Sequence, residues 1–189
     1  MALVACRALA AVLCLVPPGD GKVGEEDQLL KLDFDAFDQR PGAGWRLLAQ
    51  KGRHLDAAKL IDRYREKHKE LDESRQGILF FHAGQMYAFA DDYKTALQRF
   101  PKSKHAQEPP ELPIRWNAYV DATIAFLGKD LNRLKECREQ IAKGPSFRGE
   151  KANLNVVDSL IENFGKPYRD AYGAHAKKPP AKKESPQRQ

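Results

Sequence analysis

Apolar residues recur every three or four positions along most of this 189-residue chain. The clearest stripes lie at residues 79–87, 116–127 and 154–164, and no segment alternates apolar and polar residues over the length of a strand. The observed spacing places apolar side chains on one face of an α-helix, whereas a half-buried strand needs strict alternation. We therefore expect an all-α fold, and the length suits one domain or one short array of repeats.

Short segments rich in glycine, proline and aspartate divide these stripes into about seven helices. Such residues end helices or form tight turns, because glycine adopts left-handed backbone angles and proline lacks an amide proton. The expected helices therefore pair into successive hairpins over residues 34–173. The breaking segments are Gly52, Asp91-Asp92, residues 109–113, Gly128-Lys129-Asp130, Gly144-Pro145 and Gly165-Lys166-Pro167.

One hairpin carries a repeat-like pattern. Residues 80–87 read Phe-x2-Ala-Gly-x2-Tyr, and residues 93–100 read Tyr-x2-Ala-Leu-x2-Phe. This pattern resembles the tetratricopeptide repeat, in which small residues let two helices cross closely and aromatic residues fill the groove to the next hairpin. Weaker counterparts at Ala57 and Leu134 lie 39 residues before and 38 residues after Ala96, against about 34 in the ideal repeat. The resemblance implies a short tetratricopeptide-like solenoid.

Four longer blocks, at residues 40–45, 82–89, 115–127 and 155–173, together resemble a group of small exported bacterial proteins. The resemblance covers about residues 34–173. It implies an all-helical fold and a setting in the bacterial cell envelope. It brings with it no activity, ligand or catalytic residue.

The N-terminal segment 1–19 is apolar apart from Arg7, and a polar chain follows it. Such a stretch is too short to span a bilayer, which takes about 20 residues, and it is typical of a secretory signal peptide. We expect an exported protein, periplasmic or secreted, with residues 20–33 as a linker or leading helix. Leu3-Val4-Ala5-Cys6 also matches a lipoprotein box, but almost nothing precedes it, and a buried N-terminal helix is the other alternative.

The formal net charge of +6 is concentrated outside the body of the chain. Residues 174–189 carry +4 and the leader +1, so that residues 20–173 carry only +1. A nucleic-acid-binding domain places its basic residues on the folded face that meets phosphate, so no nucleic-acid partner is expected. The tail 174–189 is predicted to be disordered. The tail either makes a weak contact with an anionic envelope surface or is a dispensable end that increases solubility.

The sequence contains none of the common catalytic or metal-binding motifs. HExxH, GxSxG, P-loop and GxGxxG patterns are absent, and the five histidines are scattered. We expect a non-catalytic protein without a cofactor or metal, and an inert Cys137. The acidic run Asp33, Asp35 and Asp38 lacks the glycine and glutamate of a calcium loop, so it is interpreted as a solvated helix face.

The leading functional hypothesis is a protein–protein interaction module with an unidentified protein or peptide as its partner. Its groove would be lined by side chains from the first helix of each hairpin. His82 and Gln85 lie one turn apart in such a helix, where they could bind a ligand or join two helices. The groove candidates are Trp45, His82, Gln85, Tyr87, Asn117 and Asp121.

The alternative is an enzyme or small-ligand binder with a site in the helical groove near His82, Asn117 and Asp121. This hypothesis requires the three side chains to converge in one cavity. The competing interpretation is structural: an inter-helix hydrogen bond for His82, and a cap on a neighbouring helix end for Asn117 and Asp121.

Overall fold

The computed structural model describes residues 20–109 and 112–174, which are helical and contain no β-strand. The expected all-α class is therefore confirmed for the described part of the chain. The predicted signal peptide, residues 1–19, and the part of the tail beyond Ala174 lie outside the described residues. The α-helices are α1 (Asp20–Leu29), α2 (Arg46–Gln50), α3 (His54–Lys67), α4 (Glu73–Phe89), α5 (Tyr93–Arg99), α6 (Trp116–Leu127), α7 (Leu131–Lys143), α8 (Leu154–Glu162) and α9 (Tyr168–Ala174).

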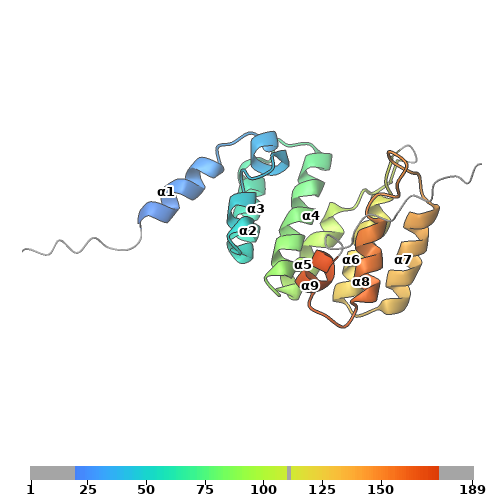
Figure 1. The fold of residues 1–189 in the computed structure, drawn as a ribbon. Coiled ribbons are helices and arrows are strands. Elements are labelled where there is room, and N and C mark those ends of the chain that lie inside the picture. The colour runs from blue at the N-terminus through green and yellow to red at the C-terminus, as the bar shows by residue number, and fades with distance from the viewer. Residues whose placement is uncertain (1–19, 110–111, 175–189) are drawn as a thin grey trace, which may run out of the picture.

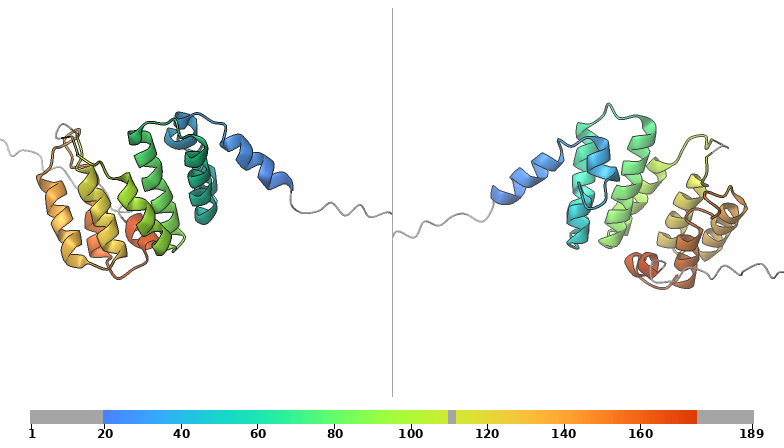
Figure 2. Two further views of the ribbon diagram at one scale, coloured as in Figure 1. Left: turned by 180° about the vertical axis from the view of Figure 1, so that it is seen from behind. Right: turned by 45° about the horizontal axis from the view of Figure 1, so that its top comes forward.

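Helices that follow one another in the sequence are also neighbours in space. The hairpins α3–α4, α4–α5 and α6–α7 make the most extensive contacts. In Figure 1 and in both views of Figure 2, α3, α4, α6 and α7 succeed one another along the molecule, and α1 projects from one end. Arg63 of α3 ties α1 to this row through ion pairs with Glu26 and Asp27, at 2.9 and 3.1 Å. No helix in the described ranges has the length and apolar character needed to cross a bilayer.

The turns between α2 and α3, between α4 and α5, and between α6 and α7 share one geometry. Each first helix ends with a hydrogen bond from an amide to the carbonyl five residues earlier, and the residue between the two helices is left-handed, with φ of 73, 62 or 61°. This arrangement satisfies carbonyls at the end of a helix that lack a helical partner. The hydrogen bonds are Arg53 N to Leu48 O, Asp92 N to Tyr87 O and Asp130 N to Ala125 O.

The second helices of these hairpins also begin alike. The fourth residue after each turn is fully buried, and these residues are Ala57, Ala96 and Leu134. Asp92 and Asp130 cap α5 and α7 by accepting the amide protons of Thr95 and Arg133, at 3.0 and 2.9 Å. The turns and the buried positions thus recur at intervals of 39 and 38 residues, which is the spacing found in the sequence.

A continuous apolar core runs through the hairpins. Within the hairpin that carries the repeat-like pattern, Gly84 faces the ring of Phe100, and a Cβ at Gly84 would lie 3.1 Å from that ring. The small residue therefore allows the close helix crossing that the pattern predicts. Cys137 is buried in α7, and burial raises the pKa of its thiol, which disfavours the reactive thiolate.

The described residues contain more helical segments than the seven or so expected. Residues 20–33 include the leading helix α1, and two short segments, the π-helix η1 (Asp35–Gln39) and the 3-10 helix η2 (Phe100–Ser103), are additional. The most consequential addition is α9, because a further helix follows Gly165-Lys166-Pro167 within the expected body of residues 34–173. Proline is well tolerated next to the first residue of a helix, where no intrahelical partner is needed for its missing amide proton.

Candidate functional site

Trp45 and His82 meet at a buried carboxylate. Asp38 has no exposed surface, and its Oδ1 accepts hydrogen bonds from Trp45 Nε1 and lies 2.8 Å from His82 Nδ1. The Trp45 bond is also 2.8 Å long, and Gln39 Nε2 donates to the other oxygen at 2.6 Å. The interpretation of Asp38 as part of a solvated face is therefore wrong. We call Asp38, Trp45 and His82 the Asp38 cluster.

The Asp38 cluster is arranged to hold Asp38 ionised. Burial alone would raise the pKa of this carboxyl, but the hydrogen bond and charge of His82, the Trp45 N–H and the nearby Arg46 together bring its pKa below the ordinary value. The carboxylate joins the π-helix η1 and the start of α2 to the middle of α4. His82 therefore makes a hydrogen bond between helical segments, as the structural interpretation of this residue expected. The polar atoms of Trp45 and Asp38 are also engaged within the protein.

Tyr87 belongs to a second internal network. Its hydroxyl donates to Asp62 Oδ2 at 2.9 Å, and Arg99 makes a two-pronged contact with the same carboxylate at 2.9 to 3.2 Å. Arg65 Nη1 lies 3.6 Å from Asp62 Oδ1. Burial and the neighbouring carboxylate raise the pKa of Tyr87 to about 12, so this phenol stays protonated. The network links α3, α4 and α5.

Asn117 and Asp121 hold the long connection between η2 and α6. The Asn117 side chain accepts from the amide of His105 and donates to its carbonyl, each at 2.9 Å. Asp121 pairs with Lys104 at 2.8 Å and with Arg133 of α7 at 3.3 Å. His82 contacts Asp38 instead, so these contacts do not bring His82, Asn117 and Asp121 together at one point.

Gln85 of α4 is buried beside Tyr168 of α9. The helix α9 packs against α8 and α4 and lies close to the end of α4 (Figure 1). Tyr168 of α9 is fully buried there, with its hydroxyl beside Gln85 and Thr123. We call the surface that contacts α9 the α9 seat; it is formed by α4, α6 and α8 together with Tyr93 at the start of α5.

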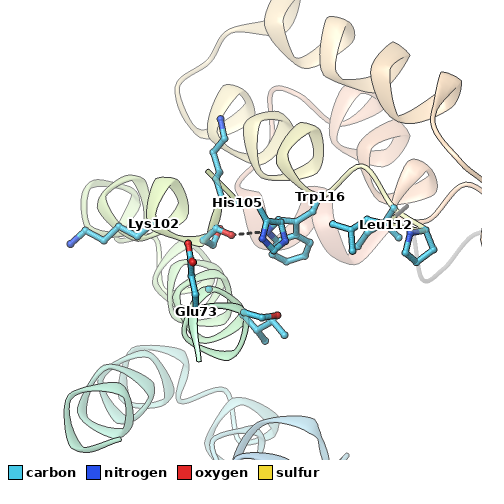
Figure 3. Close-up of a pocket in the computed structure, with 12 residues that line it drawn as sticks. Glu73, Lys102, His105, Leu112 and Trp116 are labelled. Atoms are coloured by element: carbon cyan, nitrogen blue, oxygen red, sulfur yellow. Dashed lines mark hydrogen bonds between the residues drawn. The ribbon is translucent and has the colours of Figure 1, made fainter. Parts of the chain in front are cut away.

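An open cleft of about 270 Å³ lies at the other end of α4. It is bounded by the first turn of α4, by η2 and by the connection to α6, and Figure 3 shows Trp116 and Leu112 on one side with Glu73 on the other. Trp116 Nε1 donates to the carbonyl of Ser103 at 2.7 Å, which holds the indole in this wall. None of the six sequence-predicted groove residues lines this cleft.

A smaller cleft of about 210 Å³ lies between the α2–α3 turn, the end of α4 and α9. Its walls include His54, whose Nδ1 is shielded from solvent without a hydrogen-bond partner in the described structure. Burial first and the charge of Arg169 second lower the pKa of His54, so its neutral form is favoured. Within the described ranges, no group of three or more His, Cys, Asp and Glu side chains is placed to hold a metal ion.

Sequence reasoning missed the partners that these candidates contact. Asp38 and Asp62 lie 44 and 25 residues from their partners His82 and Tyr87, and a local pattern does not report contacts at such separations. A weak signal existed for α9, because Tyr168 and Tyr172 are four residues apart and so share one face of a helix. Comparisons of the chain with protein-family models, with curated proteins and with solved structures find no match.

Proposed function

We propose that the chain is a non-catalytic, exported helical-repeat protein that binds a protein or peptide partner in the bacterial cell envelope. Its hairpins would stack as a short tetratricopeptide-like solenoid, with the first helix of each hairpin facing the partner. The observation that carries this proposal is the repetition of one turn geometry at intervals of 39 and 38 residues. Stacked hairpins of this kind present an extended surface suited to binding another chain.

The cleft beside α4, and not the six candidate residues, also supports a binding module. The polar atoms of Trp45, Tyr87 and Asn117 contact groups of the same chain, which fixes the helices relative to one another. The cleft beside α4 is mostly apolar, with Ile78, Leu112 and Trp116 in its walls, and it is open to solvent. Mostly apolar concave surfaces with a few polar groups are typical of binding sites.

Site-specific photocrosslinking tests the binding proposal. A photoreactive amino acid replaces Ile78, which is half-buried in the cleft, in the cells that make the protein. We expect a discrete crosslinked adduct with another protein. The matched control carries the same group at Lys135, an exposed position on α7 away from the cleft, and should form no such adduct.

Three outcomes would contradict parts of the proposal. The absence of an adduct at Ile78, or the same adducts at Ile78 and Lys135, would argue against a specific partner at this cleft. Fractionation of the same cells tests export separately, and recovery of the protein only in the cytoplasm would argue against an envelope setting.

A further inference from the structure

The helix α9 has the properties of a bound peptide. It contains seven residues, whereas isolated helices shorter than about 12–15 residues are marginal in water. Its order therefore depends on the surface against which it packs. Tyr168 and Ala171 of α9 are completely buried in the α9 seat, while Gly165, Lys166 and Pro167 of the preceding connection are exposed.

The α9 seat contacts the main chain of α9 with two of its own hydroxyl groups. The hydroxyl oxygen of Tyr93 accepts the amide proton of Tyr168 at 3.0 Å, and Ser159 Oγ donates to the carbonyl of Ala171 at 2.8 Å. Tyr93 lies 75 residues from Tyr168 in the sequence. Main-chain amides and carbonyls are present in any peptide, so these two contacts can hold segments of other sequences.

Two aromatic rings of α9, four residues apart, pack into the α9 seat. Tyr168 packs against Phe89 of α4 and Phe126 of α6, with ring centres 5.5 and 5.8 Å apart. Tyr172 packs edge-on against Phe89 at 5.3 Å. Residues four positions apart lie on the same face of a helix, so a single short helix can present both rings at once.

Tyr168 fits the α9 seat imperfectly. Its hydroxyl is shielded from water beside Gln85 and Thr123, but it makes no well-formed hydrogen bond in the described structure. A buried polar atom without a partner is unfavourable, and a phenylalanine ring would fill the same space without this penalty. A competing segment with Phe at the first position would therefore bind better than α9 itself.

We propose that the α9 seat is a binding site for a short partner helix with two aromatic side chains four residues apart, and that α9 occupies it in the resting chain. This inference rests on the proposed function and names the chemistry of the partner. The exposed residues 165–167 of the connection let α9 leave without unfolding of α8. Because a tethered segment has an effective concentration of about millimolar, a free partner must bind more tightly than α9 does.

A peptide-binding experiment on the full chain tests this proposal. The probe is a dye-labelled synthetic peptide with the sequence of residues 163–174, in which Phe replaces the first tyrosine. Its binding to the wild-type chain and to the double variant Tyr168→Ala/Tyr172→Ala is measured by fluorescence polarisation. Removing the tethered competitor should tighten binding by at least about tenfold. A control peptide with alanine at both aromatic positions should bind neither protein.

A cleavable chain keeps the test decisive if the double variant does not fold. A protease site is inserted at Gly165-Lys166, where the connection is exposed, and the folded protein is cut there. We expect the released segment to stay associated and to be displaced by an excess of the probe peptide. Loss of cooperative melting after the cut would show that α9 is an inseparable part of the core, and would overturn the proposal.

Two further outcomes would also overturn it. Equal binding of the probe to the wild-type chain and to a folded double variant would remove the competition on which the proposal depends. A wild-type dimer that dissociates on Tyr168→Ala would show that a second copy of the chain fills the seat. In either case an adduct at Ile78 would still support the binding module, whereas tight peptide binding without that adduct would support the α9 seat alone.

Discussion

The Asp38 cluster and the α9 seat are both buried, but they hold their elements in different ways. The Asp38 cluster joins η1 and α2 to α4 through a buried carboxylate with two donors at 2.8 Å. The α9 seat holds a seven-residue helix through aromatic packing and two hydroxyl contacts. A buried ion that loses a partner is strongly destabilising, whereas a short helix on an exposed connection can detach locally. The comparison therefore predicts a rigid N-terminal contact and an exchangeable C-terminal one.

The largest effect is expected from Asp38→Ala. This change leaves the buried Trp45 N–H without its acceptor and His82 without its carboxylate, and should lower the free energy of unfolding by about 3 kcal/mol. Urea denaturation followed by circular dichroism measures it. The matched control is Asp35→Ala, which alters an exposed residue of the same segment and should change stability by under about 0.5 kcal/mol. Similar losses for the two variants would mean that the Asp38 cluster does not lock the N-terminal elements.

Tyr168→Ala is expected to have a large but local effect. Truncating this fully buried ring removes its contacts with Phe89 and Phe126, so α9 should detach while the hairpins stay folded. Hydrogen exchange should show amide protection in α9 falling by about 100-fold, with that of α4 changed by less than about threefold. A parallel loss of protection in α4 would erase the proposed difference between the two regions.

Tyr168→Phe should act in the opposite direction and more weakly. It removes the hydroxyl that lies buried without a well-formed hydrogen bond, while it keeps the ring against Phe89. We expect α9 to be held more firmly by about 1 kcal/mol, seen as slower exchange of its amides. Faster exchange would indicate that the hydroxyl contributes a favourable contact with Gln85 or Thr123.

The smallest expected effect is a dependence on acid pH. Because the pKa of Asp38 is below its ordinary value of 3.8, the unfolded chain binds the proton more readily than the folded one. The stability contributed by this group is fully present above about pH 4 and declines as the pH falls through the lowered pKa. Denaturation midpoints of the wild type and Asp38→Asn, measured between pH 5 and 2.5, should converge toward acid pH. A constant difference would contradict the role of the ionised carboxylate.

Much of the secondary structure could be predicted from local patterns. The apolar stripes located α4, α6, α7 and α8, and Gly52, Asp91-Asp92 and Gly128-Lys129-Asp130 marked the three similar turns. These features depend on neighbours within five residues, because helix periodicity and turn geometry are local. The last helix, α9, was not predicted. Pro167 was taken as the end of the last helix, although a proline is equally suited to the position before a new one.

The candidate site was less predictable, since its residues are defined by distant partners. Trp45, His82 and Tyr87 were recognised as notable side chains, yet their partners Asp38 and Asp62 were not. Asp38 lies in an acidic run that favours an exposed helix, and only the packing of η1 against α4 removes it from solvent. Gln85 was placed correctly on a first helix, but the segment that contacts it is more than 80 residues away.

The sequence by itself determined that the described body is helical and where three hairpin turns fall. Apolar spacing, glycine and capping aspartates act over a few residues, so their consequences are written into short stretches of chain. Only the tertiary structure decided that Asp38 is buried beneath His82 and that α9 lies on α4, α6 and α8. Both outcomes depend on segments far apart in the sequence. Packing stabilises a helix too short to be stable alone, and the donors of Trp45 and His82 compensate Asp38 for its lost hydration.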